Sequence, residues 1–292
     1  MSSLRLFFLA SVILSFGACS EQSVEEAQVE LTELARFGIE LRESSGLARH
    51  GGAFWLINDS GNEPTLYELE ESGEIRRAIT VSGVDNRDWE SLAHDEEFLY
   101  IAETGNNLNR WDAFTIYRVR WRDLESDTVD ADSIIFTYGD YRSGSPRSHN
   151  FDSEALTVRG AELWLFTKNR GDGNTNLYRF PKVPGHYSPK PSQSFNLGSL
   201  VTAADIHPAT GQLALLSHES VFGGNNIERL WLAPTTEEGV DTLQLKAMRI
   251  LPIDQWEAVL WSQDGQRLFF SHERSQRRFA GMAKLEMKEL ES

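Results

Sequence analysis

Cysteine is nearly absent from this sequence, which contains one, Cys19, in 292 residues. No intramolecular disulfide can form with a single cysteine, whatever the redox state of the compartment. The stability of the fold must therefore come from a buried core. The chain is long enough to bury such a core in one large domain.

Several motifs with well-understood chemistry are also missing. The sequence has no His-x-x-x-His or Cys-x-x-Cys pair of the kind that binds a transition metal. It has neither a Gly-x-Ser-x-Gly nucleophile elbow nor a glycine-rich loop that would cradle a phosphate. The strongest sequence signatures of zinc enzymes, serine hydrolases and P-loop proteins are thus absent.

Basic residues are few compared with acidic ones: 28 Lys and Arg stand against 44 Asp and Glu, for a formal charge of −16. A surface this acidic repels DNA, RNA and anionic lipid, so we expect no nucleic-acid partner. The charge is compatible with cations or cationic ligands, although it would also serve solubility alone.

The apolar run near the N-terminus, residues 6–14, is too short for a membrane-spanning helix, which needs roughly 20 apolar residues. After Arg5, it suits the apolar region of a cleavable signal peptide. Small residues at 17 and 18 then precede Cys19, which looks like a lipobox, where the cysteine is acylated and becomes the N-terminus. Phe16 departs from the usual leucine, and an ordinary signal peptide with a chance cysteine is the alternative.

Ser20, rather than Asp, follows the cysteine, and by resemblance to known sorting patterns this favours the outer membrane. We therefore expect residues 1–18 to be a lipoprotein signal peptide. Acylated Cys19 would anchor the protein in outer-membrane lipid, facing the periplasm or the cell surface. The polar, acidic residues 19–28 would form a tether to a folded domain of residues 29–292.

Five segments of that domain align as repeats of a short apolar strand, a turn and a longer apolar strand, at a period near 50 residues. The aligned units begin at Ser45, Glu90, Glu154, Ala204 and Glu257. Further strand-like segments follow each unit, and four strands per period is the signature of a β-propeller. We predict an all-β propeller with five blades. A sixth, degenerate blade stays open, because the longest interval leaves extra chain after the second unit.

The fifth unit lacks an outer strand, whereas the segment Val29 to Phe37 has no unit of its own. We predict that this segment supplies the missing strand and closes the ring, since closure removes sheet edges that would otherwise pair with other chains. Four of the five units carry aromatic residues in the second strand, and these are expected to pack between blades: Trp55, Tyr100, Trp164, Phe269 and Phe270.

Strand direction in a propeller places the start of each innermost strand and the end of each second strand on one face of the disc. Most candidate acids, bases and amides fall in the loops of that face. Glu90, Glu154 and Glu257 begin innermost strands, nearest the axis, and Glu43 and Asp205 stand close to that position in the other two units. Several carboxylates near one axis need a cation, a base or raised pKa values.

Two kinds of compensation are open. Carboxylates together with the amide oxygens of Asn58, Asn106 or Asn107 suit Ca²⁺. The alternative is internal pairing with the basic side chains of the same face, namely Arg87, Lys168, Arg170, His218 and His272. Asp59, Asn107, Lys168 and Arg170 are candidate ligand contacts. His218 and His272 both occur as Ser-His-Glu at the end of a second strand and could act as general acids or bases, although repeat ancestry would also explain them.

The first two units carry the most specific pattern: Ser44-Ser-Gly-Leu-Ala48, Trp55-Leu-Ile-Asn-Asp-Ser-Gly61 and Asp88-Trp-Glu-Ser-Leu-Ala93. This pattern resembles the SdiA-regulated propeller family, and more loosely the gluconolactonase and strictosidine synthase-like propellers, over roughly residues 40–110. In the gluconolactonase-like families a glutamate that opens a blade helps to hold a central divalent cation. The resemblance implies that role for Glu90 and Glu154. The loops of this chain depart from that pattern in being rich in Lys, Arg and His.

Three functions follow as alternatives. The first is an envelope-anchored, monomeric propeller that binds a small-molecule or protein ligand, with Ca²⁺ on its axis. The second is a metal-dependent esterase, lactonase or phosphoesterase, in which His218 or His272 would be the base for a metal-bound water. The third is a non-catalytic disc that binds protein partners.

Overall fold

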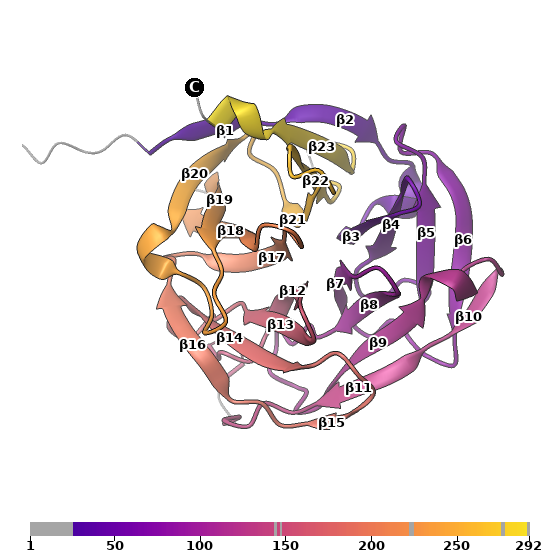
Figure 1. Ribbon diagram of the computed structural model, residues 1–292, viewed down its shortest axis with the longest axis horizontal. Helices are drawn as coiled ribbons and strands as arrows, with labels where there is room; N and C mark the ends of the chain where they lie inside the picture. Colours follow the sequence, from indigo (N-terminus) through magenta and orange to yellow (C-terminus); the bar gives the residue numbers. More distant parts are fainter. Residues whose placement is uncertain (1–25, 143–144, 147, 222–224, 276–277, 291–292) are drawn as a thin grey trace, which may run out of the picture.

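Five sheets stand around a common axis in the computed structural model, which describes residues 26–142, 145–146, 148–221, 225–275 and 278–290 (Figure 1). Cys19 and the expected signal peptide lie outside the described residues. The fold is thus an all-β, five-bladed propeller, as the repeats predict. Each blade runs outward from an innermost strand near the axis.

The blades follow one another along the chain. Blade 1 is β3 (Ser44–His50), β4 (Ala53–Asn58), β5 (Thr65–Leu69) and β6 (Ile75–Ser82). Blade 2 is β7 (Trp89–His94), β8 (Phe98–Glu103), β9 (Phe114–Arg120) and β11 (Asp132–Phe136). Blade 3 is β12 (Ser153–Arg159), β13 (Glu162–Thr167), β14 (Asn174–Pro181) and β16 (Pro191–Asn196). Blade 4 is β17 (Leu200–Ile206), β18 (Gln212–Val221), β19 (Asn225–Pro234) and β20 (Lys246–Leu251). Blade 5 is β21 (Trp256–Trp261), β22 (Arg267–His272) and β23 (Gly281–Glu286), with β2 (Thr32–Arg36) outside them.

The N-terminal segment closes the ring, which confirms the prediction for Val29 to Phe37. β2 pairs antiparallel with β23 as the outer strand of blade 5. The residues just before it form β1 (Gln28–Glu30), which pairs in parallel with β20 of blade 4. One short segment therefore joins two blades and covers the edges of both sheets.

Two internal segments also pair in parallel with the outer strand of the preceding blade. β10 (Thr128–Asp130) precedes the outer strand of blade 2 and pairs in parallel with β6 of blade 1. β15 (Gly185–Tyr187) precedes the outer strand of blade 3 and pairs in parallel with β11 of blade 2. β10, together with the 3-10 helix η2 (Trp121–Asp123), takes up part of the extra chain in the second unit, so there is no sixth blade. The other 3-10 helices are η1 (Ile39–Leu41), η3 (Thr242–Gln244) and η4 (Met287–Leu290).

The core is divided into five apolar clusters, each between two neighbouring blades. The second-strand aromatics Trp55, Tyr100, Trp164, Phe269 and Phe270 belong to these clusters, as expected. Burial of one such side chain contributes roughly 1.5–3 kcal/mol. Blade-to-blade packing therefore holds the innermost strands, and the residues at their ends, in fixed positions.

No helix in the described part of the chain is long and apolar enough to span a membrane.

Candidate metal centre

A β-bulge near the start of each innermost strand sets the position of one residue per blade. The ladder between the first two strands shifts at Glu90 in blade 2, at Glu154 in blade 3 and at Glu257 in blade 5. In blade 4 the equivalent residue is Thr202, and in blade 1 it is Ser45, followed by Gly46. A bulge leaves its extra residue out of the ladder, so these five side chains are presented at the same place in their blades.

This register corrects the alignment of the fourth unit, because Thr202, and not Ala204, corresponds to Glu90. Asp205 lies three residues beyond Thr202, toward the other end of β17. Its carboxylate accepts hydrogen bonds from the backbone N–H groups of Trp261, at 2.7 Å, and Ile206, at 2.9 Å. The expectation that Asp205 stands near the start of the strand was therefore wrong. Burial raises the pKa of Asp205 to about 6.

Five carboxyl groups converge on blades 1 to 3. Asp59, Asp88 and Glu90 form one group of three, and Glu90, Asp152 and Glu154 form a second. Within each group, one oxygen atom of every residue lies within 4.8 Å of the others. Glu90 and Glu154 are only 7% and 5% exposed, and Asp152 is completely buried. We call these five residues the axial carboxylates.

The backbone explains how residues outside the bulge join this cluster. Asp88 and Asp152 each stand two positions before a bulged glutamate, and each extends the pairing past the end of the strand. The carbonyl of Asp152 accepts from the N–H of Lys168 at 2.8 Å, and that of Asp88 accepts from Gly105 at 3.3 Å. The repeated Asp-x-Glu at the start of two units was the sequence signal for Asp88 and Asp152, which sequence reasoning missed as site residues.

Gly105 makes room for the carboxylates. A Cβ atom on this residue would lie 2.2 Å from Asp88 Oδ2 and 2.3 Å from Glu90 Oε1, far inside van der Waals contact. Any other residue at 105 would push these oxygens apart. The close grouping of the two carboxyl groups therefore depends on a glycine here.

Basic side chains make ion pairs on only one side of the cluster among the described residues. The Lys168 ammonium contacts the Glu154 carboxylate. The Arg170 guanidinium lies 3.0 Å from Asp152 Oδ2 and 3.8 Å from Glu154 Oε1. In the described ranges, no lysine, arginine or histidine lies within ion-pair distance of Asp59, Asp88 or Glu90. Internal pairing thus compensates the carboxylates of blade 3 and leaves the others uncompensated.

The pKa values reflect this imbalance. Burial, followed by repulsion from Glu154 and Asp59, raises the pKa of Glu90 well above its usual range. Burial and the nearby Asp59 carboxylate raise the pKa of Asp88 to about 7. Burial also raises the pKa of Glu154 to about 7, although Lys168 opposes the rise. A bound cation would favour the ionised forms and reverse these shifts.

Three further carboxyl groups lie on the side of blades 4 and 5. Glu257 is half-buried, and burial raises its pKa well above the usual range, with Lys168 opposing the rise and Glu154 adding to it. Burial raises the pKa of Glu273 to about 7 and that of Glu228 to about 8. Of these, sequence reasoning selected Glu257 alone.

The two candidate histidines are not equivalent. Trp256 in blade 5 and Val201 in blade 4 both stand just before the bulge of their strand. Trp256 pairs with His272 and Val201 pairs with Ser217, so Ser217 is the equivalent of His272. His218 is therefore one residue further along its strand. Successive side chains of a strand point to opposite sides, so the two rings have different surroundings. Burial lowers the pKa of His218 to about 3, with the charges of Lys168 and Arg170 adding to the effect.

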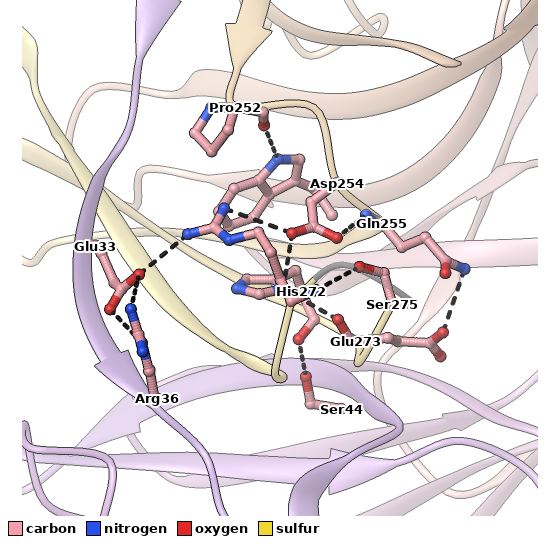
Figure 2. A network of polar contacts seen from close by, with 11 residues as sticks. Glu33, Arg36, Ser44, Pro252, Asp254, Gln255, His272, Glu273 and Ser275 are labelled. Carbon is pink, nitrogen blue, oxygen red and sulfur yellow. Dashed lines mark hydrogen bonds and ion pairs between the residues drawn. The ribbon is translucent and has the colours of Figure 1, made fainter. Parts of the chain in front are cut away.

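His272 belongs to the network that joins blade 5 to the closing strand (Figure 2). Its Nδ1 atom lies 3.0 Å from the carbonyl oxygen of Glu273 and 3.5 Å from Asp254 Oδ2. Arg278 lies 3.5 Å from the same Asp254 oxygen and 3.1 Å from Glu33 of β2. The backbone carbonyl of His272 also accepts a hydrogen bond from Ser44 of blade 1, at 3.1 Å.

Two of the predicted amide ligands differ, because among the described residues the buried Oδ1 of Asn58 has no hydrogen-bond partner, whereas that of Asn106 is engaged. Asn58 donates to the carbonyl of Glu40 at 2.7 Å. Asn106 donates to the carbonyls of Trp111 and Phe151, and its side-chain oxygen accepts from the N–H groups of Trp111 and Arg110. Both groups of the Asn106 amide are thus engaged in holding its loop, and its role as a metal ligand stays a prediction.

A pocket of about 500 Å³ opens beside the axial carboxylates. It is lined by Asn107, Leu108, Asn169, Arg170, Gly173 and Leu200. Two of the four predicted ligand contacts, Asn107 and Arg170, thus line one pocket and touch each other. Lys168 is buried against Glu154, and Asp59 is one of the axial carboxylates.

No family model matches the chain, and no curated protein matches it. Solved structures that resemble it include the catalytic domain of a GH62 α-L-arabinofuranosidase from Coprinopsis cinerea, at 10% sequence identity and a TM-score of 0.53. The match covers 89% of this chain and 97% of that one. A glucose dehydrogenase matches at 10% identity and a TM-score of 0.52, over 87% of this chain and 98% of that one. At such identities the likeness shows the β-propeller fold alone.

Proposed function

We propose that this protein binds a divalent cation among the axial carboxylates and a small ligand beside the cation. Ca²⁺ is the cation that we propose. Glu90 carries the proposal. The residue is only 7% exposed and lies among four other carboxyl groups, and in the part of the chain that the structure describes its carboxylate has no hydrogen-bond donor or basic partner. A buried charge of this kind is costly unless it is paired, protonated or bound to a metal.

The donor atoms favour a hard cation. All five axial carboxylates offer oxygen, the ligand that Ca²⁺ and Mg²⁺ prefer, whereas zinc sites are dominated by His and Cys. Ca²⁺ accepts six to eight oxygens in flexible geometry, whereas Mg²⁺ demands a near-ideal octahedron and keeps several waters. A crowded set of carboxylates from three blades fits the first description better.

We further propose that the propeller is held at the outer membrane through acylated Cys19 and acts as a monomer. A polar chain between Cys19 and β1 would let the site reach ligands in the periplasm or at the cell surface.

A metal-dependent hydrolase is the second candidate, and His218 would be its base. The charges of Lys168 and Arg170 act on this imidazole, which places it near the cluster, although a pKa of about 3 makes it a weak proton acceptor at pH 7. The cation would supply Lewis acidity and lower the pKa of a coordinated water. His218 would then accept the proton. A protein-binding scaffold needs neither feature.

Metal analysis of the protein, purified without chelators, tests the proposed function. Inductively coupled plasma mass spectrometry should find calcium near one equivalent, and Gly105→Ala should lose it, because the added methyl group separates Asp88 from Glu90. A Glu71→Gln control, which removes an exposed carboxylate elsewhere, should retain it. Protein that stays free of divalent metal after dialysis against Ca²⁺ would refute the proposal. An esterase and phosphoesterase screen of calcium-loaded protein, with His218→Gln as its control, separates the two candidates.

A further inference from the structure

The pocket beside the axial carboxylates contains a single charged side chain among its lining residues, that of Arg170. Its walls also carry the apolar side chains of Leu108 and Leu200 and the amide of Asn107. A volume of about 500 Å³ lies within the usual range of small-molecule pockets, roughly 300–1,000 Å³. The pocket thus combines one positive charge with apolar surface, in a protein that is strongly acidic overall.

The Nε and Nη2 atoms of the Arg170 guanidinium are held by neighbouring side chains, and in the part of the chain that the structure describes Nη1 is free. Nε and Nη2 lie 3.1 Å and 3.0 Å from Asp152 Oδ2, and Nη2 also contacts the Asn107 side-chain oxygen. Nη1 has no hydrogen bond or ion pair with any residue in the described ranges. The side chain is 23% exposed. A planar guanidinium fixed through Nε and Nη2 is well suited to donate from Nη1 to an oxyanion.

We infer that this pocket binds a small organic oxyanion, a carboxylate or phosphate monoester with an apolar substituent, and that Arg170 pairs with its charged group. The apolar substituent would contact Leu108 and Leu200. The inference rests on the proposed cation site for its energetics. A neutral or cationic ligand would leave the positive charge at Arg170 Nη1 unpaired.

Cation and anion binding must be coupled, because they share Asp152. This carboxylate neutralises Arg170 and also belongs to the cluster with Glu90 and Glu154. Without a cation, the surrounding carboxylates repel an anion. When Asp152 and Glu154 turn their oxygens to a cation, the charge of Arg170 is no longer balanced and the pocket attracts an anion. Coupling of this kind is reciprocal and typically changes affinity 5- to 150-fold.

Isothermal titration calorimetry of the full chain with phenyl phosphate and with benzoate tests this inference. Phenol serves as the neutral probe of the same shape, and each titration is run with saturating Ca²⁺ and with chelator. We expect both anions to bind at least about fivefold more tightly with Ca²⁺, and phenol to bind in neither condition. Which anion binds more tightly identifies the charged group.

Arg170→Gln should abolish anion binding and leave Ca²⁺ binding as strong or stronger, since Asp152 loses its competing partner. Arg122→Gln, which removes an exposed arginine outside the pocket, is the control and should bind both as the wild type does. Anion binding that survives Arg170→Gln, or that ignores Ca²⁺, overturns the inference. Ca²⁺ binding with no response to either anion overturns it too but leaves the cation site intact. Wild-type protein that binds no Ca²⁺ overturns the proposed function itself.

Discussion

Lys168 and Glu154 form an ion pair in the interior of the propeller, with each side chain 7% exposed. Glu90 is buried to a similar degree in the next blade and has no such partner. Both glutamates occupy the bulge of an innermost strand, so their backbone positions are equivalent. The two residues differ in the side chains that surround them. The cation site is proposed from that difference.

Removal of the lysine should make Glu154 resemble Glu90. Lys168→Met leaves a buried carboxylate without its partner, a change that typically costs about 3–5 kcal/mol. We expect this loss in urea unfolding of the metal-free protein, and a larger stabilisation by Ca²⁺ than in the wild type. Lys168→Met combined with Glu154→Gln should recover much of the stability. A single variant as stable as the wild type would show that the pair is unimportant.

Stability of the metal-free protein should fall as the pH rises from about 6.5 to 8.5. Burial raises the pKa of Glu228 to about 8 and those of Glu273 and Asp88 to about 7, so the folded state holds protons that the unfolded chain has released. A raised carboxyl pKa gives stability at low pH that is lost as pH passes through the folded value. The lowered pKa values of His218 and His94 act in the opposite sense, but this effect fades above about pH 7, where unfolded histidine has lost most of its protons.

Glu228→Gln isolates one part of this dependence. Glu228 is 2% exposed, lies opposite His218 in the β18–β19 ladder and is not one of the axial carboxylates. The amide cannot ionise, so the variant should lose less stability than the wild type between pH 6.5 and 8.5. Urea midpoints across this range measure the effect. An identical pH profile would show that Glu228 titrates normally.

Deletion of the closing strands should cause aggregation. β1 and β2 cover the edges of blades 4 and 5, and Val29, Leu31, Ala35 and Phe37 are buried in the two clusters beside blade 5. A chain without residues 26–37 would expose strand edges and core, which size-exclusion chromatography would detect as oligomers. A chain that starts at Glu26 is the control. A monomeric deletion variant with an unchanged melting temperature would contradict the account.

Cys19→Ser tests the anchor. We expect the variant to move from the membrane fraction to the soluble fraction, because no acyl chain can then be attached. Mass spectrometry of the wild type should show the lipid. Retention of the variant in the membrane fraction, with an unlipidated wild type, would contradict the proposal.

The period of about 50 residues and the four strands per unit were sufficient to predict the fold, because each repeat must bury its faces against its neighbours. β10 and β15 were missed, since three residues are too few to show a period and their partners lie in another blade. Pairing between distant segments is invisible in local sequence.

The candidate site was predicted in part. Glu90 and Glu154 were selected by their repeated position, and they do come together. Thr202 was missed because the alignment of the fourth unit slipped by two residues, and a bulge cannot be read from a hydrophobic pattern. The uneven distribution of charge was also hidden. Lys168 and Arg170 were candidates to neutralise the whole cluster. Which carboxylates they contact depends on side-chain packing, which cannot be predicted from the sequence.

The melting temperature of wild type and Glu90→Gln, each measured with chelator and with Ca²⁺, tests the central claim most directly. A hundredfold excess of Ca²⁺ over its Kd would stabilise the wild type by about 2.7 kcal/mol, or roughly 5–10 °C. Glu90→Gln should unfold at or above the wild-type temperature without metal, because the amide cannot take on the charge that burial and the neighbouring carboxylates disfavour, and it should lose most of the rise with Ca²⁺. No rise in the wild type, or an equal rise in both proteins, would contradict a cation site at Glu90.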